Sequence, residues 1–418
     1  MLRRMLLSRL TLVVFSVLLP LVMVEISLRA WRWLHPSPIP DQSNARVVSR
    51  PAYRTPGFHY AYQDNFATME YHPALGFRPS PDQEGNGYRI NKHGFRSRGE
   101  IDAIESGEIR VFLLGGSFAF GAGCADGYTY ADVLEKNIKA PPGKRVRIIN
   151  AGVGAYTSYQ EFVLLLTQIR QLQPSLVVHL SGWNDAYNGY CGRSVLDGND
   201  YMNLRGAFEA CIDRKILEKH RQFFIDQETP PDWSDYRLKL HYYMAKMSHA
   251  RRAQQEVAVK KKKASRPPEE VIGNLKLLLE LEKTVADRDH FEVLYVLQPD
   301  LYSTKKELHE HEQKIKSAGT VGLLGIIDYY PPLFGAYRAK LPDICSSLNI
   351  EFMDSEAALE KVESNTCCFV DHVHFGEIGQ EWLGRYLADQ INPRLVGIEE
   401  RNTKSSTRAK KSTSTAQR

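Results

Sequence analysis

Short apolar runs alternate with helical patterns along most of this chain. The runs stand at 110–114, 146–153, 176–180, 291–297 and 351–353. Runs of this length, bounded by glycine or polar residues, are typical of strands buried on both faces of a parallel sheet. Between them, apolar residues recur three and four positions apart, as in Tyr130, Val133, Leu134 and Ile138. The pattern predicts an α/β fold, in which a five-stranded parallel sheet lies between two layers of helices.

Two further features of the sequence predict where one helix begins and where the alternation of strands and helices is interrupted. Ser158 and Glu161 have the spacing of a capping box, which would open a helix that Pro174 ends. More than one hundred residues, about 186–290, separate the third run from the fourth. Because a plain crossover between parallel strands is much shorter, we expect a helical insertion there that could cover the nearby edge of the sheet.

The first 35 residues differ from the rest of the chain. Three arginines precede a mostly apolar stretch at 10–28, close to the roughly 20 residues that a membrane span needs. A cleaved signal peptide is the alternative, but arginine and tryptophan follow the stretch instead of a small-residue cleavage pattern. We therefore expect a retained signal-anchor at 1–35, a proline-rich linker at 36–74 and a main domain at 75–392. This domain would lie on the extracytoplasmic side, periplasmic or extracellular, of a single-pass membrane protein.

The charge of the chain gives no indication of a nucleic-acid partner. The net charge is +5, but residues 401–418 hold six lysines and arginines and no acid, so the remainder carries −1. A nearly neutral body offers no basic surface for nucleic acid. The tail at 393–418 has few apolar residues, and we expect it to be basic and disordered.

Six cysteines form an even set, which suits disulfides outside the cytosol. They lack the C-x-x-C pairs of a zinc site, so we expect neither a metal nor another cofactor. As a hypothesis, Cys191 pairs with Cys211, and Cys345 pairs with Cys367 or with its neighbour Cys368.

Candidate chemistry follows four of the predicted strands. Ser117 follows the first run, Gly152 the second and Asn184 the third, while Asp371 and His374 come after the fifth. The carboxyl ends of parallel strands meet at one edge, so these residues should converge there. Ser117 would then be a nucleophile, His374 its general base, and Asp371 the group that orients the imidazole. The backbone N–H groups of Ser117 and Gly152 and the side-chain amide of Asn184 would bind a developing oxyanion.

The spacing Asp-x-x-His is by itself a weak signal. Asp287 and His290 repeat it, but they precede the fourth run and should lie at the opposite edge of the sheet. His372 is another candidate base, although Phe369 instead of an acid stands three residues before it. The order of all four blocks along the chain is the stronger signal.

Together these blocks resemble the SGNH/GDSL hydrolase superfamily. The matching segments are Gly115-Gly116-Ser117, Gly152 within INAGVGAYTS, Gly182-Trp183-Asn184-Asp185 and Asp371-His372-Val373-His374. The lead-in LGFRP…RINKHGFRSRGE is similar to the segment before this domain in exported members. The resemblance covers roughly 75–392 without most of the insertion. One residue departs from it, because Gly116 stands where the family has aspartate.

The resemblance implies a flavodoxin-like three-layer α/β/α sandwich and serine esterase or acyltransferase chemistry without a metal. The substrate would be an acylated small molecule or glycan, and the anchored, exported members suggest deacetylation of a cell-surface polysaccharide. An O-acyltransferase with the same triad and a non-catalytic carbohydrate-binding module remain as alternatives.

Three further motifs are weaker. The segment 115–119 approaches the G-x-S-x-G elbow of α/β-hydrolases, but its last residue is alanine and the serine follows the first strand. Gly152-Val153-Gly154 lacks the third glycine of a dinucleotide fingerprint. The segment 307–312, ELHEHE, is predicted to be a charged helix face and not a metal motif.

Overall fold

The structure, a computed structural model, describes the chain in three main stretches. These are residues 69–198, 265–318 and 326–415, with gaps at 73, 86, 98, 100, 102 and 364–365, and Met23 stands apart from them. The predicted anchor, the linker up to residue 68 and the centre of the predicted insertion, 199–264, lie outside the described residues, Met23 excepted. Within the described stretches, no helix combines the length and the apolar character needed to span a bilayer.

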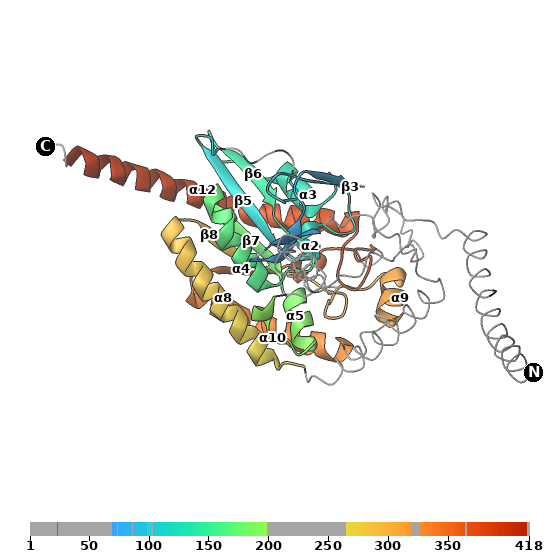
Figure 1. The fold of residues 1–418 in the computed structure, drawn as a ribbon. Coiled ribbons are helices and arrows are strands. Elements are labelled where there is room, and N and C mark those ends of the chain that lie inside the picture. Colours follow the sequence, from blue (N-terminus) through green and yellow to red (C-terminus); the bar gives the residue numbers. More distant parts are fainter. Residues whose placement is uncertain are drawn as a thin grey trace, which may run out of the picture. The chain divides into compact units, whose positions relative to one another are not determined.

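Five parallel strands form the central sheet (Figure 1). They are β5 (Glu108–Gly115), β6 (Arg145–Asn150), β7 (Leu176–Ser181), β8 (Glu292–Leu297) and β9 (Glu351–Asp354), in the spatial order β6-β5-β7-β8-β9. The predicted five-stranded parallel sheet is thus confirmed, one strand for each apolar run. The strand order reverses between β5 and β7, and ligands of doubly wound sheets bind beyond the carboxyl ends of the strands at such a point.

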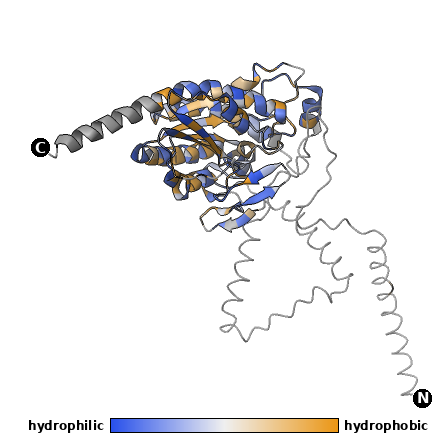
Figure 2. Cartoon of the chain, turned by 90° about the horizontal axis from the view of Figure 1, so that it is seen from above, coloured by the Kyte–Doolittle hydropathy of each residue, from blue (hydrophilic) through white to orange (hydrophobic). Residues whose placement is uncertain are grey.

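Helices cover both faces of this sheet. One face carries α3 (Tyr130–Asn137) and α12 (Glu377–Thr415), and the other carries α4 (Ser158–Thr167), α8 (Pro268–Asp289) and α10 (Ile326–Ser347). Val111 and Leu113 of β5 belong to the first core, whereas Phe112 and Leu114 belong to the second. All eight residues of β5 are buried, which explains the apolar residues at 111–114, and Glu108 and Arg110 at its start are buried as an ion pair. Figure 2 shows hydrophobic residues gathered between the layers and hydrophilic ones on the outer faces of the helices.

The segment before the sheet forms two small antiparallel hairpins. They consist of β1 (Met69–His72) with β2 (Gly76–Pro79) and β3 (Gln83–Gly85) with β4 (Tyr88–Ile90). The remaining short elements are α2 (Ser117–Phe120), η2 (Ile169–Leu172), α5 (Trp183–Tyr190), η3 (Val195–Asp197), α9 (Glu310–Ala318) and α11 (Glu356–Leu359).

Two predicted boundaries of the helices were wrong. The capping box of α4 is formed by Thr157 with Gln160, one residue earlier than predicted. Glu161 is buried inside the domain instead. The predicted insertion at 186–290 is too long, because α5 begins at the end of β7 and α8 packs on the sheet as an ordinary crossover helix.

The predicted disordered tail was also wrong for residues 393–415, which continue α12. Leu387, Ile391 and Leu395 fix the first half of this helix in the core. No glycine or proline occurs after Gly397, so neither of the two strongest helix breakers interrupts this part of the helix. Continuation of a helix that is already formed is much easier than nucleation of a new one.

The predicted disulfide of Cys345 is absent as well. Cys345, Cys367 and Cys368 are free thiols. Cys345 belongs to the core on the α8 face of the sheet, and Cys368 belongs to the core on the α12 face, so the sheet separates them. Cys191 is also free, and its predicted partner Cys211 lies outside the described residues.

Candidate active site

Ser117 stands at the carboxyl end of β5, as the first residue of the one-turn helix α2. Gly115 makes the turn possible, because its φ is +145° and a Cβ there would lie 2.4 Å from the Leu180 carbonyl oxygen. Only glycine adopts such a conformation without strain. The strand therefore ends in a tight turn that leaves the Ser117 side chain partly exposed at the sheet edge.

Ser117 meets two residues of a loop that is distant in the sequence, and the three form one hydrogen-bonded chain. The Oγ of Ser117 lies 2.7 Å from Nε2 of His374, and Nδ1 of the same imidazole lies 2.8 Å from Oδ2 of Asp371. If Nδ1–H donates to the carboxylate, Nε2 is left as the acceptor for the Ser117 hydroxyl. The structure thus brings together the predicted nucleophile, base and orienting acid in the arrangement that the chemistry requires.

The Asp371 carboxylate is held as an anion by its surroundings. Burial alone would raise its pKa, but the adjacent His374 and His372 and the hydrogen bonds it accepts outweigh burial and lower the pKa well below its usual range. Its Oδ1 accepts the backbone N–H groups of Val373 and His374 at 2.8 and 2.7 Å. The acid and the base are therefore fixed within a single turn.

A buried glutamate that the sequence did not indicate anchors this loop. Oε1 of Glu312 accepts the N–H groups of Cys368 and Phe369 at 2.8 and 2.9 Å. Its Oε2 accepts from Nζ of Lys306 at 2.7 Å and from the N–H of His309 at 2.9 Å. The predicted charged face at 307–312 was thus wrong for Glu312, whose side chain is fully buried and ties α9 to the segment that leads into Asp371.

Asn184 lies over the nucleophile turn. It is the second residue of α5, and its Nδ2 donates to the Tyr156 carbonyl at 2.7 Å. A Cβ at Gly116 would stand only 2.2 Å from this Nδ2. The missing side chain at position 116 therefore makes room for the amide next to Ser117, which gives a physical reason for glycine at this position.

The predicted oxyanion role of Gly152 does not fit the structure. Its N–H donates to Oδ1 of Asn150 at 3.0 Å. A Cβ on Gly152 would lie 2.5 Å from the backbone nitrogen of Phe120, so glycine is needed there for packing against α2 and not for access of a substrate. In the same loop, Ala155 adopts a φ of +70°, and backbone strain of this kind gathers at functional sites.

Arg96 of the lead-in segment secures the other end of α2, and sequence patterns gave no sign of it. Its guanidinium is buried and donates to the carbonyls of Phe120 and Gly121 at 3.1 and 3.0 Å. It also donates to the Cys124 carbonyl at 2.7 Å and forms an ion pair with Asp126. The hairpins before the sheet are therefore physically coupled to the turn that carries Ser117.

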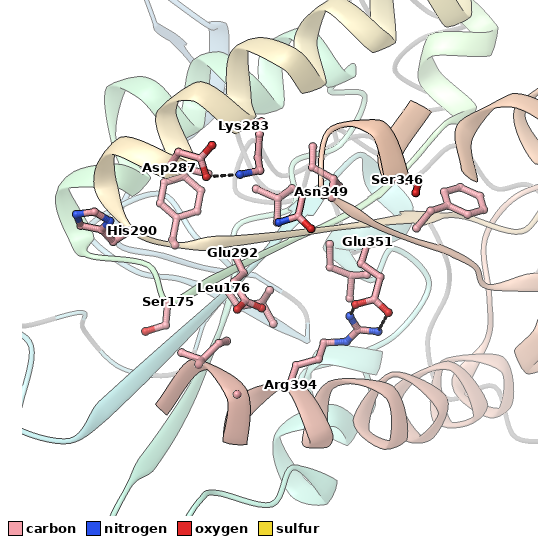
Figure 3. Close-up of a pocket in the computed structure, with 18 of the residues that line it drawn as sticks. Ser175, Leu176, Lys283, Asp287, His290, Glu292, Ser346, Asn349, Glu351 and Arg394 are labelled. Carbon is pink, nitrogen blue, oxygen red and sulfur yellow. Dashed lines mark hydrogen bonds and ion pairs between the residues drawn. The ribbon is translucent and has the colours of Figure 1, made fainter. Parts of the chain in front are cut away.

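The competing histidines are placed elsewhere. The ring of His372 packs against Trp183 and Tyr302, at centroid distances of 5.2 and 6.2 Å, while His374 contacts Ser117. Asp287 and His290 line a hollow of about 990 Å³ at the amino ends of β7, β8 and β9 (Figure 3). This hollow also holds the ion pairs Lys283–Asp287 and Arg394–Glu351. It lies at the edge of the sheet opposite to Ser117, as the order of the motifs predicts.

No group of three or more histidine, cysteine, aspartate or glutamate side chains in the described stretches is arranged to hold a metal ion.

Comparisons with known proteins give similar structures but no matching sequences. No protein-family model matches this chain, and no curated protein matches it. Among solved structures, the acetylxylan esterase Axe2 from Geobacillus stearothermophilus is 12% identical, with 68% of this chain and 94% of that chain covered and a TM-score of 0.35. The acetyl xylan esterase AlAXEase is 12% identical, with 68% and 98% covered and a TM-score of 0.34.

A lipolytic-type protein assigned to the G-D-S-L family, from Desulfitobacterium hafniense, is 12% identical, with 67% of this chain and 98% of that chain covered and a TM-score of 0.32. The solved structures that resemble this chain thus include esterases and a G-D-S-L protein. At these TM-scores we base neither fold nor function on the likeness.

Proposed function

We propose that this chain is a serine esterase, in which Ser117, His374 and Asp371 form the catalytic triad. The observation that carries the proposal is the unbroken chain of contacts from the Ser117 hydroxyl through the imidazole to the carboxylate, at 2.7 and 2.8 Å. A chance cluster of polar side chains would rarely match the distances, the order and the sheet edge at once. The Asp371 anion then stabilises the imidazolium that forms during the reaction.

In the first half of the proposed reaction, the Ser117 Oγ attacks the ester carbonyl carbon while its proton passes to Nε2 of His374. The tetrahedral intermediate then breaks its bond to the alcohol oxygen, and the imidazolium returns the proton to the departing alcohol. In the second half, water attacks the acyl carbon while His374 takes a proton from the water; the bond to the Ser117 Oγ then breaks, the imidazolium returns the proton to that oxygen, and the acid leaves.

We propose two donors for the oxyanion. The N–H of Ser117 belongs to the first turn of α2, where backbone N–H groups have no partner within the helix. The Asn184 amide carries two N–H bonds, of which one donates to Tyr156. The other can donate to an oxygen beside Ser117. Donors fixed in place before reaction are commonly the largest single contribution to catalysis.

The finer parts of the proposal concern substrate and location. We propose that the substrate is an acylated small molecule or glycan, and that the enzyme acts outside the cytoplasm, anchored through residues 1–35. An acetylated cell-surface polysaccharide suits such a location. The apolar stretch at 10–28 supports the location. An O-acyltransferase on a glycan is the second candidate, because it would use the same acyl-enzyme.

Hydrolysis of p-nitrophenyl acetate by the wild type, Ser117→Ala and His374→Ala tests the proposal. The wild type should release acetate with water alone, and both variants should lose at least about a thousandfold in kcat while remaining folded. Turnover of Ser117→Ala close to that of the wild type would reject the nucleophile. An acyltransferase would instead need an added sugar acceptor, and a carbohydrate-binding module would bind the glycan without any turnover.

A further inference from the structure

A network of buried polar side chains lies directly beneath the first turn of α5, outside the triad. Asp185, the neighbour of Asn184, is almost fully buried. Its Oδ1 accepts the backbone N–H of Ser158 at 2.9 Å, and its Oδ2 accepts the Ser158 hydroxyl at 2.5 Å. The carboxylate thus sits at the N-terminus of α4, where the helix dipole favours an anion.

Helix α4, whose first residue binds Asp185, is itself fixed to the sheet. Glu161, one turn into α4, accepts the Ser181 hydroxyl and lies 2.7 Å from Nδ1 of His179 on β7. Nε2 of His179 lies 2.8 Å from Glu282 on α8. Burial alone would lower the pKa of His179, but the two flanking carboxylates overcome burial and raise it to about 10. The imidazole therefore donates on both sides and locks α4 to β7.

Two adjacent residues of α5 consequently bind the same short segment before and at the start of α4. Asn184 donates to the Tyr156 carbonyl, and Asp185 accepts both donors of Ser158 two residues later. The first contact sets the direction of the Asn184 amide. The second fixes the backbone that carries its acceptor.

Such a carboxylate is costly to keep in the core. It is faced by Ser158 and Glu161 of α4, by His179 of β7, and by Tyr295 of β8 and Tyr337 of α10. Burial and the neighbouring Glu161 charge raise the pKa of Asp185 to about 7. An apolar residue would pack at this place without such a penalty, so a role beyond packing accounts better for the acid.

We propose that Asp185 is a positioning residue for the oxyanion donor, because it holds the start of α4 against α5 so that the Asn184 amide faces Ser117. This inference rests on the proposed esterase function. It implies that removal of the Asp185 carboxylate acts on turnover through Asn184 and leaves the Ser117–His374–Asp371 contacts in place.

The test compares kcat and KM for p-nitrophenyl acetate in full-length Asp185→Ala, Asn184→Ala and the double variant, with Glu282→Ala as the matched control. Glu282 is an equally buried carboxylate of the same network, but it lies on α8 and pairs with His179 of β7 instead of binding the start of α4. We expect Asp185→Ala to lower kcat about tenfold to a hundredfold with KM nearly unchanged, because a donor displaced by about 1 Å loses most of its effect. Asp185→Ala should add less than about twofold in the Asn184→Ala background. Glu282→Ala should lower the melting temperature and keep kcat.

Conservative substitution separates positioning from general loss of structure. Asp185→Asn keeps an acceptor for the Ser158 N–H and should recover most of the lost kcat, while Ser158→Ala should show a smaller loss that also vanishes without Asn184. These two variants decide the matter if Asp185→Ala does not fold. Full independence of the Asp185 and Asn184 effects, or an equal fall of kcat in Glu282→Ala, overturns the positioning role. A wild type without any turnover would instead overturn the proposed function.

Discussion

Substitution of Gly116 by alanine tests how the site is built around Ser117. The backbone at Gly116 is extended with a negative φ of −79°, so alanine does not need the left-handed conformation that favours glycine. The new Cβ would stand 2.2 Å from Nδ2 of Asn184, 3.3 Å from its Cγ and 3.4 Å from the Tyr156 carbonyl oxygen. The perturbation therefore falls almost entirely on the amide of Asn184.

The expected magnitude follows from that contact. The amide nitrogen must retreat by about 1 Å to reach an ordinary contact distance, and a misplacement of this size costs about a hundredfold in rate. A hundredfold loss in kcat corresponds to about 2.7 kcal/mol of transition-state stabilisation. Complete loss of one oxyanion donor costs about a hundredfold to a thousandfold, which is the upper limit for Gly116→Ala.

The assay is steady-state hydrolysis of p-nitrophenyl acetate by Gly116→Ala, Asn184→Ala and the double variant. Because both substitutions act on one donor, the double variant should be no slower than Asn184→Ala alone. Gly273→Ala is the control, since a Cβ there meets no atom within 4 Å. Wild-type kcat in Gly116→Ala, or losses that multiply in the double variant, would refute this account of Gly116.

Three further predictions concern the parts that support the site. Glu312→Ala removes one partner of a buried ion pair and should destabilise the fold by about 3–5 kcal/mol in urea unfolding; a change below about 1 kcal/mol would contradict the anchoring role. The pKa of Asp185 is raised from 3.8 to about 7 in the folded state, so its contribution to stability is full below about pH 4 and is lost as the pH rises to about 7. Asp185→Asn should remove this pH dependence of stability between about pH 4 and pH 7. If the urea midpoint of the variant still changes with pH as in the wild type, another group causes the dependence. Peptide mass spectrometry after thiol alkylation of the denatured, unreduced protein should find Cys345, Cys367 and Cys368 all modified, whereas an unmodified pair would restore the disulfide.

The sheet and the triad were predictable because their signals are local. Each strand contains an apolar run of its own, and residues 111–114 before Ser117 are all apolar because both faces of the strand are covered. Asp371 and His374 lie three residues apart, so one turn of chain brings them together. Ser117 and His374 meet because parallel strands end at the same edge, a rule of topology that needs no knowledge of packing.

The supporting residues were not predictable because their partners are distant in the chain. Glu161 has capping-box spacing after Ser158, but the structure places it against His179, and its neighbour Gln160 forms the box. The glycine at position 152 was interpreted as leaving room for a substrate. In the structure it leaves room for the close approach of α2, a contact that the sequence does not show. Glu312 has the sequence pattern of a charged face, because the N–H groups of Cys368 and Phe369 that it binds come from a segment more than fifty residues later.

Labelling with a fluorophosphonate, followed by peptide mass spectrometry, is the most direct test of whether His374 activates Ser117 as a nucleophile. The reagent forms a covalent bond only with a serine that an adjacent base has activated. We expect a single adduct on Ser117 in the folded wild type, none in Ser117→Ala, and much slower labelling in His374→Ala. A folded wild type that stays unlabelled, or an adduct on another serine, would contradict it.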